Sequence, residues 1–415
     1  MTGPTAVPES EPAVPAQSLL QRGDIRALLF GLFIAGAGQT FSFAVLPALG
    51  RRLGLSSFDM SFIITMAAIV FMFGGPVWGR ISDTFGRRRV ILFGGACYGL
   101  TTALFAVFSI AGLEGWLDAG TTLVLLIIGR MLYALLSGGM FPASFAYIAD
   151  NTSREARGRG MALGSAAFGL GAVIGPALAA AIAPLGLVAP FFLFAALAAI
   201  ATTVNWVWVK APERDARGAL PRFRFSRRFL PLMLCGVLLF STQGSLQQAT
   251  GFYIQDLLRV LPDDSVKLTG FIITAASAAA VLMQIAIVQR LQWRPKRLIA
   301  TGAFITAIGA ALFVVADAYW VMLVAGALMG AGFGLGDPGF TAGMSLLVGP
   351  GRQGVIAGLG GMTRGMAFMV GPLVAGITFE ALGPRAPYIF STASLVAALA
   401  LVLLIRVPRP EDQVT

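Results

Sequence analysis

Twelve long runs of apolar residues restrict the folds open to this chain more than any other feature of its sequence. They cover about residues 25–48, 59–79, 90–112, 121–149, 160–183, 188–210, 229–257, 266–289, 298–316, 319–348, 355–379 and 385–406. Each run is long enough to cross the hydrocarbon core of a bilayer as a helix. Irregular backbone cannot satisfy its hydrogen bonds in lipid. The sequence therefore predicts an all-α membrane protein with twelve transmembrane helices.

One long polar interruption, at about residues 211–228, divides the spans into six and six. The sequence thus predicts a six-helix bundle over 25–210 and a second over 229–406, with a short cytoplasmic tail at 407–415. Residues 1–24 contain no apolar run and read as a disordered cytoplasmic tail. A hydrophobic content of 57%, with 12% charged residues, is too apolar for a soluble surface and agrees with this layout.

The positive charges are distributed unequally between the two sides of the predicted membrane layout. With the first tail inside, the cytoplasmic segments carry 23 Arg and Lys and the outer loops carry 5. Such an asymmetry places both termini in the cytoplasm. The net charge of +11 is then a topology signal, so no nucleic-acid partner is expected. We expect a multi-pass protein of the plasma membrane, the inner membrane of a bacterium.

The two halves of the chain repeat one pattern of glycine and proline. A shift of 196 residues moves Gly138, Pro142, Gly175 and Pro176 onto Gly334, Pro338, Gly371 and Pro372. Matching glycines and prolines predict matching bends and close backbone approaches in the two halves. Two like halves in an apolar chain are typical of secondary transporters, whose site lies at the repeat interface.

The predicted loop between the second and third spans holds a conspicuous polar motif. It contains Gly79, Asp83, Gly86, Arg87 and Arg88. The glycines allow a tight turn, and the aspartate can cap a helix N-terminus. A loop that only sets topology would explain the arginines but not the aspartate and both glycines at this spacing. We therefore expect a structural or gating role for the loop.

This loop carries in full the signature Gly-x-x-x-Asp-x-x-Gly-Arg-Arg of the major facilitator superfamily, which the chain resembles along its whole length. A second stretch is similar to the proton-coupled, twelve-helix drug antiporters of that superfamily: Arg130, Gly138-Gly139, Pro142 and Gly171-x-x-x-Gly175-Pro176. The chain departs from that pattern in having Ala179-Ala180 after the proline and no embedded acid in the first span. The resemblance implies two bundles and proton-coupled export of hydrophobic or amphipathic compounds by alternating access.

The resemblance also implies which residues gate transport. They are Gly79, Asp83, Gly86, Arg87, Arg88, Asp150, Gly175 and Pro176. Asp83 is expected near the start of the eleventh helix, and Arg87 near Asp150, as a latch on the cytoplasmic side.

Three charged side chains, Asp337, Arg364 and Arg130, fall deep inside predicted spans. Each costs about 2.5–3.5 kcal/mol at mid-membrane on insertion scales. Asp337 precedes Pro338, and Arg364 lies at comparable depth in a neighbouring span, so the two could pair. They would serve proton coupling or substrate binding, or form a neutral structural pair. The resemblance implies proton coupling for Arg130; alternatively its side chain extends to the outer surface.

Several amides and aromatic side chains are candidates for the wall of a substrate cavity. They are Gln39, Phe141, Gln243, Gln247, Gln248, Tyr253 and Gln284. Gln243 and Gln247 are four residues apart and share one helical face. The amides could equally hydrogen-bond neighbouring helices, and the aromatic rings could simply pack between helices or against lipid.

Other classes of function find little support in the sequence. The chain has no histidine, no phosphate-binding loop and no arrangement of nucleophile and base, so no enzyme, metal site or cofactor is predicted. Energy should then come from an ion gradient. The expected partners are a small-molecule substrate, protons and the lipid bilayer, with the protein a monomer. A proton-coupled importer or facilitator of a specific metabolite, a lipid translocator and a transporter-like sensor stay open as alternatives.

Overall fold

The computed structural model describes residues 16–210, 227–291, 293–347 and 353–404, which are almost entirely helical. In chain order the helices are α1 (Ala16–Gln21), α2 (Gly23–Arg52), α3 (Ser57–Phe85), α4 (Arg87–Leu113), α5 (Ala119–Ser137), α6 (Met140–Asp150), α7 (Arg154–Ile182), η1 (Ala183–Leu185), α8 (Ala189–Trp208), η2 (Arg227–Phe229), α9 (Leu230–Leu258), α10 (Pro262–Met283), the π-helical η3 (Gln284–Val288), α11 (Gln289–Leu291), α12 (Pro295–Val315), α13 (Tyr319–Leu346), α14 (Gln353–Leu382) and α15 (Ala386–Leu404).

Within these described residues, twelve helical segments are long and apolar enough to cross a membrane. α5 and α6 together make one span, and α10, η3 and α11 make another. The predicted twelve-helix class is confirmed, with bounds within a few residues. The predicted disordered tail needs a correction, because Ala16–Gln21 is helical and buries Leu19. Residues 1–15, most of the central loop and the residues after 404 lie outside the described part of the chain.

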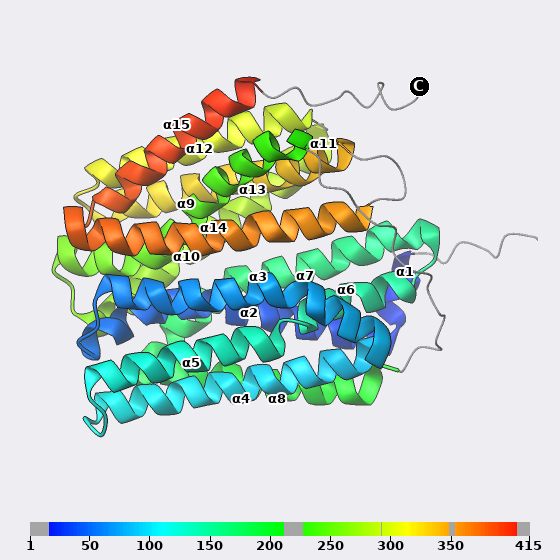
Figure 1. Ribbon diagram of the computed structural model, residues 1–415, viewed down its shortest axis with the longest axis horizontal. Coiled ribbons are helices and arrows are strands. Elements are labelled where there is room, and N and C mark those ends of the chain that lie inside the picture. The colour runs from blue at the N-terminus through cyan, green and yellow to red at the C-terminus, as the bar shows by residue number, and fades with distance from the viewer. Residues whose placement is uncertain (1–15, 211–226, 292, 348–352, 405–415) are drawn as a thin grey trace, which may run out of the picture.

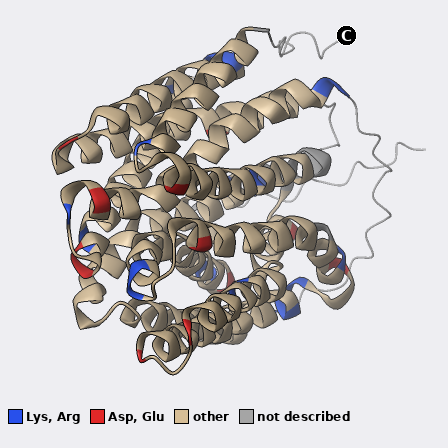
Figure 2. Ribbon diagram, turned by 60° about the vertical axis from the view of Figure 1, so that its left-hand side comes forward, with Lys and Arg blue, Asp and Glu red and all other residues tan. Residues whose placement is uncertain are grey.

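The long helices form two bundles (Figure 1), a first half made of α2 to α8 and a second half made of α9 to α15. The start of α2 and the end of α15 lie at the same end of the molecule (Figure 1), which we call the terminal end; the opposite end is the distal end. Long stretches of helix without charge separate the charged residues (Figure 2), as a lipid environment requires.

Exposed tryptophans mark both ends of the bundle. Trp116 and Trp320 lie at the distal end, and Trp206 and Trp208 lie at the terminal end. Their side chains are more than half exposed. Tryptophan is enriched where a membrane meets water, so the two pairs bracket an apolar band.

The repeated glycines bring helices to close contact in both halves. A Cβ atom on Gly175 of α7 would lie 2.2 Å from the Ala37 carbonyl oxygen of α2. A Cβ atom on Gly371 of α14 would lie 2.2 Å from the Ser241 carbonyl oxygen of α9. The two contacts join corresponding helix pairs of the repeat. The close approaches predicted from the repeated glycines are therefore present at matched positions.

Side-chain hydroxyls cross-link the same two helix pairs. Thr40 Oγ1 donates to the Ala172 carbonyl over 3.0 Å in the first half, and Ser245 Oγ donates to the Gly371 carbonyl over 3.1 Å in the second. Contacts between small residues and hydrogen bonds of this kind hold helices together where lipid offers no hydrophobic driving force.

The fourth span breaks where its repeat partner does not. α5 ends at Ser137 and α6 begins at Met140, whereas α13 continues through Pro338. The difference follows from the two consecutive glycines that precede Pro142 in the fourth span. The indole nitrogen of Trp78 donates to the Leu135 carbonyl over 2.6 Å and so satisfies a group near the break. The helix is therefore interrupted in one half and continuous in the other at this matched position.

The two glycine contacts predict matched effects on stability. Valine at Gly175 or at Gly371 would overlap a backbone carbonyl that cannot move without shifting its helix, so each substitution should destabilise the protein by about 1–3 kcal/mol. Gly158→Val is the control, because a Cβ atom there meets nothing within 4 Å. Thermal unfolding of the purified protein in detergent should show two large decreases and no loss in the control. Three equal unfolding temperatures would refute the close-contact role.

Candidate transport site between the two halves

The two halves are bound to each other at the distal end. Arg51 at the end of α2 contacts both oxygens of Asp256 in α9, each at 2.8 Å. The neighbouring Arg52 pairs with Asp263 at the start of α10. Glu380 of α14 accepts hydrogen bonds from the backbone N–H and hydroxyl of Ser57 at the start of α3, over 2.8 and 2.9 Å.

The hydrogen bond between halves that lies farthest from the distal end, among described residues, runs from Thr65 Oγ1 to the Met369 carbonyl over 3.3 Å. Thr65 is only about 12 Å along α3 from its distal start, at 1.5 Å per residue. Among the described residues, the polar bonds between the halves are thus concentrated at the distal end. Apolar contact continues farther, where Gly365 of α14 meets Met72 of α3.

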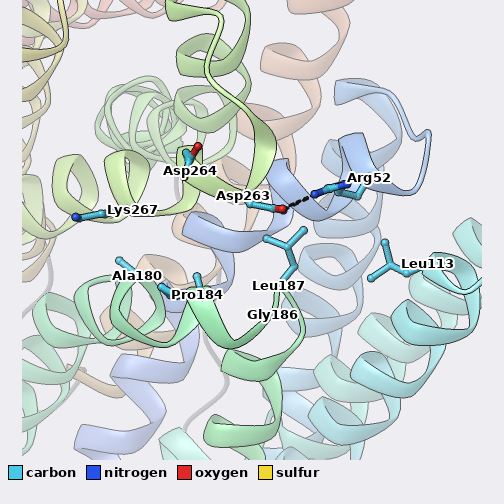
Figure 3. Close-up of a pocket in the computed structure, with 10 residues that line it drawn as sticks. Arg52, Leu113, Ala180, Pro184, Gly186, Leu187, Asp263, Asp264 and Lys267 are labelled. Atoms are coloured by element: carbon cyan, nitrogen blue, oxygen red, sulfur yellow. Dashed lines mark hydrogen bonds and ion pairs between the residues drawn. The ribbon is translucent and has the colours of Figure 1, made fainter.

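A pocket of about 490 Å³ lies beside this sealed end (Figure 3). Leu113, Ala180 and Leu187 line it together with the Arg52–Asp263 ion pair, Asp264 and Lys267. Its position at the ends of α2, α4, α7 and α10 separates it from the charged groups inside the spans, so we place the candidate site elsewhere.

Asp337 of α13 and Arg364 of α14 form an ion pair. Arg364 Nε lies 3.1 Å from Asp337 Oδ1, and Arg364 Nη2 contacts the same oxygen. Nη2 also donates to Thr341 Oγ1 over 2.9 Å. The guanidinium lies over the rings of Phe240 and Phe340, 5.2 and 5.7 Å from their centroids. The pairing left open by the sequence is therefore present.

The ion pair faces the interior of the protein. Asp337 shares a face of α13 with Gly330, which packs on α10, because residues seven apart lie on one side of a helix. By the same spacing, Arg364 shares a face of α14 with Gly371, which packs on α9. The Asp337 and Arg364 side chains are nevertheless 26% and 36% exposed. Both groups therefore remain partly accessible.

Arg130 of α5 points into the first half. Its Nη2 donates to Ser42 Oγ of α2 over 2.9 Å, and its guanidinium lies 5.0 and 5.8 Å from the ring centroids of Tyr133 and Phe105. No carboxylate of the described residues forms an ion pair with it. The exposed Ile128 lies on the opposite side of α5. Arg130 therefore does not extend to the outer surface.

Three of the candidate wall residues have side chains that are at least partly exposed. Gln39 is exposed although every other residue from Gly36 to Gly50 is buried, so its amide points into an interior space. Phe141 of α6 is partly exposed and packs at centroid distances of 4.7 Å from Phe145 and 5.0 Å from Phe168. Gln284 is partly exposed and begins the π-helical segment η3, a local widening often found at functional sites.

The amides of α9 are buried. Gln243, Gln247 and Gln248 lie among helices, and Gln248 is only 1% exposed. The side-chain oxygens of Gln243 and Gln247 and both polar amide atoms of Gln248 make no hydrogen bond to any described residue. Buried amides without partners are costly. These three amides are therefore packed between helices next to the interior, and they do not form an exposed cavity wall.

Tyr253 lies away from the interior space, contrary to the prediction that it lines the cavity. Its hydroxyl donates to the Phe313 carbonyl over 2.5 Å, and the Ala316 carbonyl lies 3.2 Å from the same oxygen, at the distal end of α12. The ring is fully buried against Tyr388. Periodicity alone could not separate a wall residue from a packed one, because both belong to apolar helix faces.

The loop of the superfamily signature forms the turn between α3 and α4. Gly86 has φ +95°, which a side chain would disfavour, and Gly79 has open space around it. Arg87 pairs with Asp150 at 3.4 Å, as the resemblance implies, and also with Asp83 at 2.5 Å. The expected contact of Asp83 with the start of the eleventh helix falls on side chains outside the described residues.

Two further residues of the gating set have clear positions. Arg88 donates to the Val209 carbonyl over 2.6 Å and to the Trp206 carbonyl over 2.7 Å, and so joins α4 to the end of α8. The Pro176 carbonyl lies 2.8 Å from where a Cβ of Gly270 would stand, at a contact between α7 and α10 of the other half.

The ion pairs at the distal end were not predicted from the sequence. A signal was available. Arg51 and Arg52 are consecutive arginines on the side that otherwise carries few, so they run against the topology rule and indicate a local partner.

Two like bundles of spanning helices, joined at one end and enclosing charged groups, define a multi-pass membrane transporter. The sequence profile described as the Major Facilitator Superfamily matches residues 28–261 and 262–415. The chain therefore belongs to the Major Facilitator Superfamily, and it is a transporter, not an enzyme.

Relatives of known function span nearly the whole chain. It is 25% identical over 390 residues to Multidrug resistance protein 1 of Bacillus subtilis (strain 168), covering 92% of this chain and 96% of that one. It is 24% identical to Quinolone resistance protein NorA of Staphylococcus aureus (strain MRSA252), covering 81% and 84%. Drug-resistance proteins are thus among its relatives.

Solved structures share the fold at low sequence identity. A bacterial homologue of the human lysosomal transporter Spinster superposes with a TM-score of 0.75 at 12% identity, covering 97% of this chain and 99% of that one. The D-xylose-proton symporter superposes with a TM-score of 0.70 at 16% identity, covering 94% and 98%. The twelve-helix architecture of the superfamily is thereby shown for this chain.

The Asp337–Arg364 pair predicts coupled effects on stability. Asp337→Asn or Arg364→Gln leaves a partly buried group without its partner and should each cost about 1–2 kcal/mol. The double variant should cost less than the two single changes added together, because both charges are then absent. Thermal unfolding of the four proteins in detergent measures the coupling. Additive effects would show that the pair does not stabilise the fold.

Proposed function

We propose that this protein exports hydrophobic or amphipathic small molecules in exchange for protons, by alternating access. Its similarity to multidrug and quinolone resistance proteins along most of their length supports the substrate class. One observation carries the coupling: Asp337 lies deep in a span, faces the interior and is paired with Arg364. An acid in that place is the natural carrier of a proton.

We propose that the terminal end is cytoplasmic and that the distal end faces outward. The inequality of 23 to 5 in Arg and Lys supports this orientation. The bonds at Arg51, Arg52 and Glu380 then close the outer side, so the conformation is the one that opens inward. Since a single chain carries both halves of the interface, we expect a monomer to suffice for transport.

Proton exchange would act on the Asp337–Arg364 pair. A proton on the carboxyl group removes its negative charge and frees the guanidinium. This step drives the conformational cycle only if the proton binds more tightly in one conformation than in the other. In this proposal Arg364 and Arg130 adjust that difference, and the two halves rotate about the fixed site.

Transport in proteoliposomes with an imposed pH gradient tests the role of Asp337. Asp337→Asn should abolish proton flux coupled to substrate, because the asparagine amide does not take up a proton at the pH on either side of the membrane. Downhill exchange of substrate should persist. Glu114→Gln, at an exposed loop position beside α4, is the control and should transport normally. Full proton coupling in Asp337→Asn would remove Asp337 from the mechanism.

The signature loop predicts a separate effect on rate. Asp83→Asn removes one partner of Arg87, which holds the turn next to Asp150, so switching between conformations should slow. Membrane insertion should be normal, because the loop keeps its arginines. Initial transport rates, divided by the amount of inserted protein, give the readout. Unchanged transport at normal expression would refute a gating role for Asp83.

A further inference from the structure

The charged side chains in the middle of the described spans carry a net positive charge. Asp337, Arg364 and Arg130 lie far from both ends of their spans. The other acidic residues of the long helices lie near helix ends; they are Asp24, Asp59, Asp83, Asp150, Glu155, Asp256, Asp263, Asp264 and Glu380. Asp337 and Arg364 neutralise each other as a pair. The guanidinium of Arg130 is therefore left as an uncompensated positive charge.

Arg130 has few of its hydrogen bonds satisfied. An arginine side chain carries five N–H donors, and Arg130 donates the single described bond to Ser42. The hydroxyl of Tyr98, buried on the neighbouring α4, makes no bond to any described residue. A cation removed from water without a counter-ion is unfavourable, and an anion bound nearby would relieve that cost.

The net charge of Asp337, Arg364 and Arg130 stays positive whether or not Asp337 carries the coupling proton. When Asp337 is ionised, the three groups carry one net positive charge; when it is protonated, they carry two. The amides of Gln39, Gln243, Gln247 and Gln248 are able to donate and accept hydrogen bonds with a substrate but add no charge. No protonation state of these groups makes the centre negative.

Aromatic rings could attract a cationic substrate, but the rings around Arg130 and Arg364 already lie against those two guanidinium groups. Phe105 and Tyr133 lie against Arg130, and Phe240 and Phe340 lie against Arg364. The partly exposed Phe141 has no arginine of the described residues over its ring, and it offers an apolar surface for the body of an amphiphile.

We propose that the central site selects anionic and zwitterionic amphiphiles over cationic ones, with Arg130 as the group that attracts the negative charge. The inference rests on the proposed function, since it takes the interior faces of the two halves as the place where the exported compound binds. It adds the charge of the substrate, which neither the fold nor the relatives' similarity supplies.

Binding to the purified full-length protein tests this selectivity without any pH gradient. Three fluorescent probes share one apolar body and carry a sulfonate, a zwitterionic group or a quaternary ammonium group. The sulfonate and zwitterionic probes should bind at least about tenfold more tightly than the ammonium probe. Arg130→Gln should weaken binding of the sulfonate probe by about tenfold and shift the preference toward the cation.

Arg159→Gln is the matched control, because it removes the same charge from an exposed position at the terminal end of α7. It should leave all three affinities unchanged. Equal or tighter binding of the ammonium probe, binding of none of the probes, or a preference that Arg130→Gln does not alter would overturn the inference.

Transport of the same probes separates this inference from the proposed function. Proteoliposomes that bind anionic probes selectively, but move none of them under a pH gradient, would reject proton-coupled export and support the charge selectivity. Proton-driven flux that favours the ammonium probe would support export and reject the charge selectivity.

Discussion

The cost of placing a charge in lipid is the constraint on which the rest of this structure depends. The long helices keep their acids near their ends, and Asp337, the exception, is placed against Arg364. The pair gains two aromatic neighbours and a threonine hydroxyl, which satisfy and enclose it. Because such a pair is expensive to build, its place in the interior of a transporter points to a task beyond holding helices together.

The closed end shows how the two halves can be held and released. Arg51 and Arg52 pair across the interface in partly exposed positions, where water competes for both charges. Ion pairs of that kind contribute little each, so the closed arrangement is stable without being permanent. The glycine contacts within each half differ from these ion pairs, because a backbone carbonyl of the neighbouring helix occupies the place that a side chain would take. Each half should therefore move as a unit, while the contacts between the halves change.

Much of the candidate site could be predicted because it rests on residue types that lipid makes rare. Asp337, Arg364 and Arg130 stand out from any apolar run, and their depth follows from counting residues along a helix. The amides of α9 and Tyr253 could not be placed in the same way. Their side chains fit a cavity wall and a packed interface equally well, and only the neighbouring helices decide between the two.

The sequence by itself determined the twelve spanning helices, their division into two like halves and the glycine positions at which helices meet, because lipid leaves the backbone no alternative to the helix and leaves close contacts to small residues. Only the tertiary structure decided that the distal end is the closed one, that Arg51 and Arg52 hold it, and that Arg130 lies without a carboxylate partner among the described residues. The first two features depend on which helices face each other across the interface, and the third depends on packing within the first half. The partners lie between 88 and 211 positions apart, so the sequence can show that such a charge needs a partner but not which residue supplies it.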